Sequence, residues 1–82
     1  MARLLFFGRL QDVTGAREIS FDLPTCIATT DDLRAHLHTQ FSEKRAFLDS
    51  VVRIAINDEF AVEPAQISNS DEIAFMPPVG GG

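Results

Sequence analysis

The order of sequence patterns predicts an α+β domain, with a mixed β-sheet packed on one principal helix. Two strand-like segments come first, at residues 4–7 and 18–23, and one amphipathic helix follows from residue 30. Further strand-like segments occupy residues 51–76. The 82 residues suffice for one domain and leave little room for a second.

The first strand is predicted at Leu4–Phe7, which is apolar on both faces. Gly8 ends it, and residues 9–14 are expected to form a helical turn that Gly15 stops. Residues 18–23 alternate polar and apolar, which is the period of a half-buried strand. Because these two strands are close in sequence, we expect them to be antiparallel.

The clearest helix begins at Thr30, whose side chain is expected to cap the free amide groups. The two aspartates that follow complement the positive end of the helix dipole. An apolar stripe with a spacing of four residues should lie on the sheet: Leu33, Leu37 and Phe41. A second, shorter helical piece is expected at residues 42–49.

The second half of the chain is richer in strand signals. Residues 51–56 are rich in β-branched side chains and predict a third strand. Asn57 tolerates positive φ and predicts a turn over residues 57–60, with a short strand over 60–62. After a second turn at 69–71, residues 72–76 predict the last strand.

This order suits the β-grasp fold, in which the first and last strands lie side by side in the centre of the sheet. We therefore assign residues 1–76 to a β-grasp domain and residues 77–82 to a flexible C-terminal Gly-Gly tail.

Composition and charge exclude several classes of function. The net charge of −5 disfavours a nucleic-acid partner, which requires a basic face. No apolar run approaches the ~20 residues that span a bilayer, and no cleavage site follows the short apolar start. We therefore expect a cytoplasmic protein without a membrane partner. The single cysteine, Cys26, is expected to be a small buried hydrophobe.

The body of the chain offers little chemistry. His36 and His38 are two residues apart on the predicted helix and point about 200° apart, so they cannot jointly hold a metal. We expect both to be exposed. No catalytic triad and no glycine-rich phosphate loop is recognisable. The body is therefore interpreted as a scaffold with no catalytic residue, metal or permanently bound cofactor.

The C-terminal segment has a different character. Pro77 and Pro78 fix φ near −65° and lack amide hydrogens, so they direct the chain away from the last strand. Val79 is followed by Gly80, Gly81 and Gly82. Six extended residues reach roughly 20 Å, and glycine needs only backbone width. Such a tail can enter the active site of another protein, although a frayed end is the alternative interpretation.

A carboxylate on Gly82 would be a poor electrophile until it is activated. Formation of an acyl-adenylate, with ATP supplied in a partner enzyme, provides a good leaving group. A sulfur nucleophile can then displace AMP and leave a terminal thiocarboxylate.

Three blocks of the chain resemble the family of molybdopterin synthase small subunits. These small subunits are the sulfur carriers of molybdenum cofactor biosynthesis. The blocks are Phe6–Gly15, Ala55–Glu59 and Asp71–Gly82, and the last is the most specific. The resemblance implies a ubiquitin-like β-grasp fold.

The same resemblance implies that Gly82 is adenylated by an adenylyltransferase and converted to a thiocarboxylate. The tail, Pro77 to Gly81, would enter the large synthase subunit and deliver sulfur to a cyclic pterin precursor. The implied assembly is a heterotetramer of two small and two large subunits. Phe7, Phe75 and Met76 are expected at the partner interface.

Two residues depart from the family pattern: Gln11 replaces a frequent basic residue, and Ser70 replaces a glycine. Neither change removes the tail. The alternatives are a sulfur carrier for thiamine or tRNA thiolation, and a ubiquitin-like protein modifier joined to lysines through Gly82. The Pro-Pro pair speaks against the thiamine type.

Overall fold

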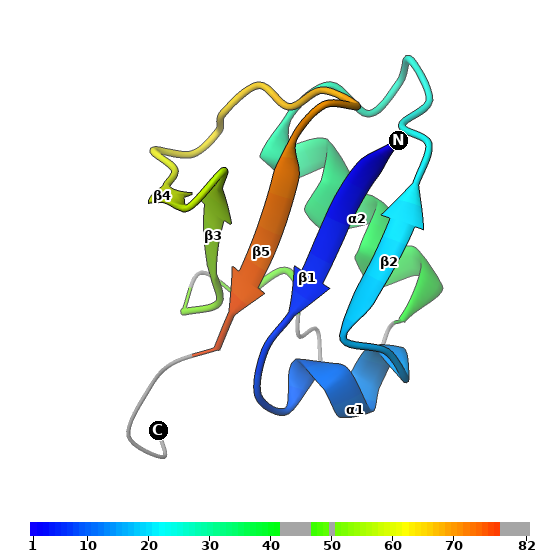
Figure 1. Cartoon of the computed structure of the whole chain (residues 1–82), viewed down its shortest axis with the longest axis vertical. Coiled ribbons are helices and arrows are strands. Elements are labelled where there is room, and N and C mark those ends of the chain that lie inside the picture. The colour runs from blue at the N-terminus through cyan, green and yellow to red at the C-terminus, as the bar shows by residue number, and fades with distance from the viewer. Residues whose placement is uncertain (42–46, 50, 78–82) are drawn as a thin grey trace.

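The computed structural model describes residues 1–41, 47–49 and 51–77. Within these residues the chain forms one five-stranded sheet and two helices. The strands are β1 (Ala2–Phe6), β2 (Glu18–Phe21), β3 (Arg53–Ile56), β4 (Glu59–Phe60) and β5 (Glu72–Met76). The helices are α1 (Leu10–Thr14) and α2 (Thr30–Gln40). Figure 1 shows α2 packed across one face of the sheet. The face turned away from α2 is called the open face below.

The first and last strands form the centre of the sheet. The strand order is β2-β1-β5-β3-β4, and β1 and β5 run parallel with Phe6 opposite Phe75. β2 pairs with β1 and β3 pairs with β5, both antiparallel (Figure 1). The predicted α+β, β-grasp layout and the antiparallel first pair are therefore confirmed.

The core lies between the sheet and α2. Aromatic rings fill the part of the core near the C-terminal ends of β1 and β5. The Phe6 and Phe75 rings stack with centroids 5.5 Å apart, and Phe47 meets Phe75 edge-on at 5.4 Å. All three side chains are fully buried. Along β1 buried residues alternate with the exposed Arg3 and the half-buried Leu5. The expectation that this strand is apolar on both faces is therefore only partly correct, because one face belongs to the open side.

The N-cap of α2 is Thr29, one residue before the predicted Thr30. The Thr29 Oγ1 accepts a hydrogen bond from the Asp32 amide at 3.3 Å, and the Asp32 carboxylate accepts one from the Thr29 amide at 3.1 Å. This reciprocal capping box requires an acidic residue three positions after the cap, which selects Thr29 over Thr30. Thr30 is instead buried, and its Oγ1 accepts from the Ala65 amide at 3.1 Å.

Three other expectations about burial are wrong. Cys26 is exposed, because it lies in the loop before α2 rather than beneath the helix. Both histidines are half-buried rather than exposed, because they flank the buried stripe of α2. The His36 ring stacks on Phe21 with centroids 5.0 Å apart, and the Nδ1 of His38 is buried.

The segment after α2 differs from the expectation where the structure describes it. Residues 42–46 and 50, which include most of the expected second helix, lie outside the described residues. The described part, residues 47–49, forms a turn, and β3 starts at Arg53 rather than at residue 51. By contrast, β5 has the predicted bounds, and Gly15 ends α1 with φ of 76° as expected.

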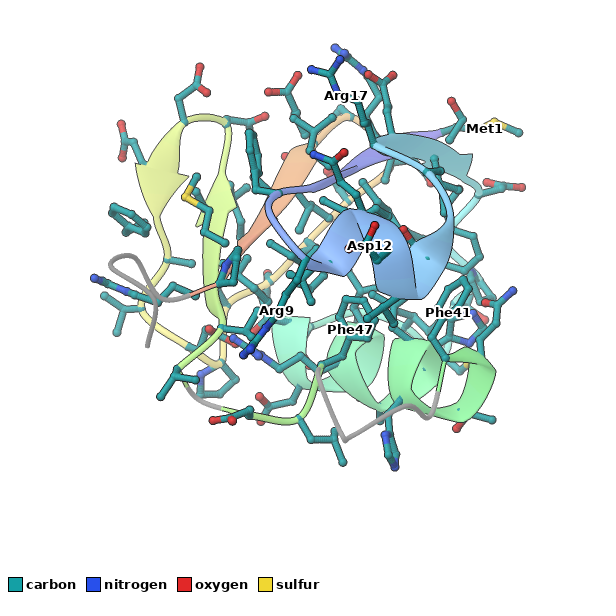
Figure 2. The ribbon with its side chains drawn as sticks, turned by 90° about the horizontal axis from the view of Figure 1, so that it is seen from below. Met1, Arg9, Asp12, Arg17, Phe41 and Phe47 are labelled. Carbon is teal, nitrogen blue, oxygen red and sulfur yellow. The ribbon has the colours of Figure 1, made fainter. Side chains whose placement is uncertain are left out.

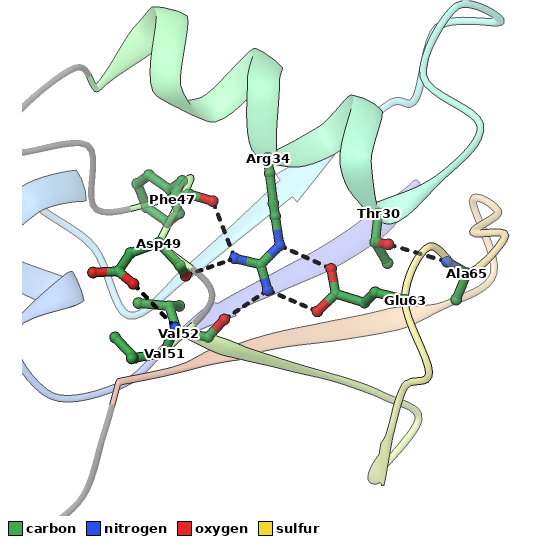
Figure 3. A network of polar contacts seen from close by, with 8 residues as sticks. All are labelled: Thr30, Arg34, Phe47, Asp49, Val51, Val52, Glu63 and Ala65. Atoms are coloured by element: carbon green, nitrogen blue, oxygen red, sulfur yellow. Dashed lines mark hydrogen bonds and ion pairs between the residues drawn. The ribbon is translucent and has the colours of Figure 1, made fainter.

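A buried arginine fixes the loops that precede and follow the β3–β4 hairpin. Arg34 on α2 is only 8% exposed, and all its N–H groups are used (Figure 3). Its Nε and Nη2 donate to the two carboxylate oxygens of Glu63 at 2.8 and 2.7 Å. The remaining donors reach backbone carbonyls of Phe47, Asp49 and Val52. The chain leading into β3 is thus held by one side chain.

Candidate functional site

The candidate site is the root of the C-terminal tail, at the end of the central strand β5. Met76 is the last residue of β5, and Pro77 is the last described residue of the chain. The part of the tail that is predicted to react lies outside the described residues. It comprises Gly82, the predicted site of adenylation and thiocarboxylation, and Pro78, Val79, Gly80 and Gly81. Their roles and the division into domain and tail stay predictions.

Two residues from opposite ends of the chain meet at this root. Gly8 has φ of +57°, in the left-handed region that favours glycine. A Cβ atom at Gly8 would lie 2.9 Å from the Cγ of Pro77, which is too close for an ordinary contact. One residue earlier, the Phe7 amide donates to the Phe75 carbonyl at 3.2 Å. Residues 7 and 8 therefore extend the β1–β5 contact up to the start of the tail.

An apolar surface surrounds the root on the open face. Strand register places Leu5, Met76 and Phe60 on this face, and Phe7 continues the alternation beyond β1. Phe7 is 44% exposed and Phe60 is 55% exposed, while Met76 is half-buried. We call these four residues the open-face patch. An exposed cluster of large apolar side chains is a feature of protein-binding surfaces.

The three residues expected at a partner interface separate in the structure. Phe7 and Met76 belong to the open-face patch. Phe75 is 0% exposed and packs in the core with Phe6 and Phe47. Alternation along β5 explains the difference, because Phe75 and Met76 point to opposite faces of the sheet. Phe75 therefore presents no surface to a partner in this structure.

The interface residues expected from the sequence did not include Leu5, Phe60 or Arg53. The Arg53 guanidinium lies 4.2 Å from the centroid of the Phe60 ring, a cation–π contact. Asn57 and Asp58, with φ of 51° and 70°, form the two-residue turn that places Phe60 opposite Ala55. Such turns set hairpin register, so this asparagine–aspartate pair was the signal that could have located Phe60.

A charged cluster borders the patch on its β2 side. The Nε and Nη2 of Arg3 donate to the two carboxylate oxygens of Glu18, both at 3.0 Å, and its Nη1 lies 2.9 Å from the Glu72 carboxylate. Hydrogen bonding to Glu18 raises the pKa of Arg3 and lowers that of Glu18. The side chains of Arg3 and Glu18 are 53% and 44% exposed and that of Glu72 is 31% exposed, so water screens these contacts and the cluster contributes little to stability.

Other kinds of site find no support in the part of the chain that the structure describes. Its histidine, cysteine and acidic side chains form no group of three that could hold a metal ion. Neither described helix has the length and apolar character needed to cross a membrane.

A family model, described as the ThiS family, matches residues 4–82. The chain belongs to the ThiS family. A molybdopterin synthase sulfur carrier subunit of Escherichia coli K12 is 33% identical over the full length of both chains. The corresponding subunit of Haemophilus influenzae is 32% identical, also over the full length of both. The resemblance inferred from the sequence blocks is thereby confirmed.

Solved structures of ThiS-like fold extend the comparison. SAMP1 from Haloferax volcanii superposes with a TM-score of 0.78 at 28% identity, over 99% of this chain and 98% of that one. A complex of subunits 1 and 2 of molybdopterin-converting factor from Helicobacter pylori gives a TM-score of 0.64 at 23% identity, over 99% and 97%. At 23% identity, the likeness to the Helicobacter pylori structure shows a shared fold alone.

Proposed function

We propose that this ThiS-family chain is the sulfur carrier subunit of a molybdopterin synthase, with the Gly82 carboxylate as the group that carries sulfur. The observation that carries the proposal is the family match through residue 82, together with full-length relatives named as sulfur carrier subunits. The root geometry supports it, because Gly8 and Pro77 pack against each other where the last strand ends.

The proposed chemistry takes place on the carboxylate of Gly82. One carboxylate oxygen attacks the α-phosphorus of ATP in a partner adenylyltransferase, and pyrophosphate leaves. A sulfur nucleophile at the oxidation level of sulfide then attacks the carbonyl carbon, and AMP leaves with the original oxygen. In the large subunit the thiocarboxylate sulfur bonds to a carbon of a cyclic pterin precursor and displaces an oxygen substituent. Water then hydrolyses the acyl–sulfur bond, so that the sulfur stays on the pterin and Gly82 returns as a carboxylate. The carrier supplies a reacting end, and the catalytic residues belong to the partners.

The open-face patch is the proposed docking surface for the large subunit, in a heterotetramer of two small and two large subunits. The patch lies next to Pro77, so a partner seated on it has the start of the tail at its edge. Aromatic and methionine side chains are enriched at the cores of protein interfaces, and Phe7, Phe60 and Met76 are of these types. This adjacency lets docking deliver the tail to the partner's active site.

Intact mass spectrometry after coexpression with the adenylyltransferase and a sulfur source tests the chemistry. We expect a mass increase equal to the replacement of one oxygen by sulfur, localised to Gly82. A variant with one residue added after Gly82 should keep the wild-type unfolding curve and show no such change. An unmodified wild-type protein, with full molybdopterin synthesis after deletion of Gly81 and Gly82, would sink the proposal.

A second candidate function is a protein modifier that uses the same carboxylate. The likeness that favours it is to SAMP1, a small archaeal modifier protein by the name of a related structure. In that case the activated Gly82 carbonyl is attacked by a lysine amine, and an amide bond forms. Tryptic peptides in which a lysine is joined by an amide bond to residues 54–82 of this chain would identify this outcome, because Arg53 is its last trypsin site.

A further inference from the structure

A depression of about 560 Å³ lies on the open face beside the open-face patch. Its walls come from β1, α1, the start of β5 and the chain that enters β2, and they include Arg3, Phe7, Gln11, Arg17, Glu18 and Glu72. Phe7 lines the depression and also belongs to the open-face patch. The two surfaces are therefore continuous, and a protein seated on the patch covers the depression as well.

The charges inside this depression are unevenly paired. Arg3 is engaged by both Glu18 and Glu72, which leaves that group of three with one net negative charge. Arg17 is exposed and has no ion-pair or hydrogen-bond partner for its side chain among the residues that the structure describes. Figure 2 shows Arg17 on the side of the sheet away from α2, at the open face.

We propose that this depression receives an acidic side chain of the large-subunit partner, with the Arg17 guanidinium as the group that binds its carboxylate. The inference rests on the proposed function, because it assumes that the open-face patch is the docking surface. Gln11, on α1, lines the same depression and offers its amide N–H groups as further donors. Arginine suits this role, since its planar donors match the two oxygens of a carboxylate.

The charge balance selects a carboxylate over more strongly charged ligands. The four charged groups of the depression sum to zero when Arg17 is included. A phosphate or a nucleic-acid backbone would bring more negative charge toward Glu18 and Glu72, which repel it. A single carboxylate on Arg17 adds one charge and leaves the bidentate Arg3–Glu18 contact unchanged.

Calorimetric titration of the purified large subunit with four full-length carriers tests the proposal: wild type, Arg17→Glu, Arg17→Lys and Arg9→Glu. Arg9 is the matched control, because it is also an exposed arginine at this end of the molecule but does not line the depression. Figure 2 shows it lying well away from Arg17. Circular dichroism verifies that every variant is folded.

We expect Arg17→Glu to raise the dissociation constant roughly three- to tenfold and to weaken the dependence of affinity on salt. Arg17→Lys should fall between wild type and Arg17→Glu, because it keeps the charge and loses the bidentate geometry. Arg9→Glu should stay within about twofold of wild type.

The remaining outcomes overturn the proposal in distinguishable ways. Wild-type affinity for Arg17→Glu contradicts the acidic contact and leaves the proposed function intact. Equal weakening by Arg9→Glu and Arg17→Glu indicates a general effect of net charge, which also contradicts the assignment. If the wild-type carrier does not bind the large subunit, the result contradicts both the proposed docking surface and the proposed partner.

Discussion

Gly8 and Pro77 are separated by almost the whole chain and pack against each other where the tail begins. Their contact depends on a missing side chain, because any Cβ at Gly8 would approach Pro77 to 2.9 Å. The positive φ of Gly8 adds a backbone requirement to this steric one. The direction in which the chain leaves β5 is thus partly set by a residue near the N-terminus.

Comparison of Gly8→Ala with Gly15→Ala separates these two requirements. Gly15 also has positive φ, of 76°, but a Cβ there would meet nothing within 4 Å. We expect Gly15→Ala to lower the free energy of unfolding by about 1–2 kcal/mol, which is the cost of the left-handed backbone alone. Gly8→Ala should cost about 1 kcal/mol more, because Pro77 or the Gly8 backbone must move.

Urea unfolding measures both costs, and NMR shifts of Met76 and Pro77 report the displacement. These shifts should change in Gly8→Ala and not in Gly15→Ala. Equal costs for the two variants, with unchanged shifts at Pro77, would contradict a role for Gly8 in shaping the root.

Single-residue environments were the least predictable part of the fold. Thr29 and Thr30 are chemically identical, and only the spacing to Asp32 distinguishes the cap from its neighbour. Cys26 was expected inside from its residue type, but its loop is exposed. Phe75 and Met76 are both apolar, and the pleat of β5 decides which one faces the core. In each case the deciding information is the local geometry, which residue type alone does not contain.

At the scale of elements, the Arg34–Glu63 pair fixes α2 to the loop after the β3–β4 hairpin, and the carbonyl contacts of Arg34 fix it to the chain before the hairpin (Figure 3). Hydrogen bonding to Arg34 lowers the pKa of Glu63 below the usual carboxyl range. A carboxyl group with a lowered folded-state pKa stabilises the fold above its unfolded pKa, and this contribution is lost as pH falls through the folded pKa.

The free energy of unfolding should therefore fall more steeply on acidification below about pH 4.3 in wild type than in Glu63→Gln. Chemical denaturation at a series of pH values measures both slopes. Glu18→Gln is an informative comparison, since the Arg3–Glu18 pair is solvent-exposed and its contribution should vanish in high salt. Parallel pH profiles for wild type and Glu63→Gln would contradict the assigned role of Glu63.

Elements were predictable where a strong periodic pattern had clear ends. β5 lies between a turn at residues 69–71 and a proline, and its predicted bounds are confirmed. The stripe of α2 is also confirmed, since Leu33 and Leu37 are buried and Phe41 packs against the core. The Arg34 network could not be anticipated, because its partners lie 13 to 29 residues away. Three of its five bonds go to backbone carbonyls and two go to Glu63.

For the whole molecule, the important division is between the two faces of one sheet. The face toward α2 contains the aromatic core, and the open face contains the exposed apolar patch and the depression with Arg17. Successive side chains of each strand point to opposite faces, so one residue packs in the core while its neighbour lies on the open face. Stability and partner binding should therefore respond to different substitutions.

Phe7→Gln and Phe75→Leu test this separation. Phe75→Leu should lower the free energy of unfolding by about 1–2 kcal/mol, because it removes a ring from a fully buried cluster. Phe7→Gln should change it by less than about 0.5 kcal/mol but weaken binding to the large subunit by roughly tenfold or more. Urea denaturation and calorimetric titration give the two numbers. A destabilised Phe7→Gln protein with unchanged affinity would reverse the assignment.

The central position of β5 also has a mechanical consequence. β5 is paired with β1 on one side and with β3 on the other, and Pro77 follows directly from its end. A pull on the chain beyond Pro77 acts along β5, across ladders whose hydrogen bonds run between the strands. Both ladders are then loaded in shear and must yield together, whereas a terminal edge strand could peel off bond by bond. The domain is thus anchored to resist force at the end where a partner would grip it.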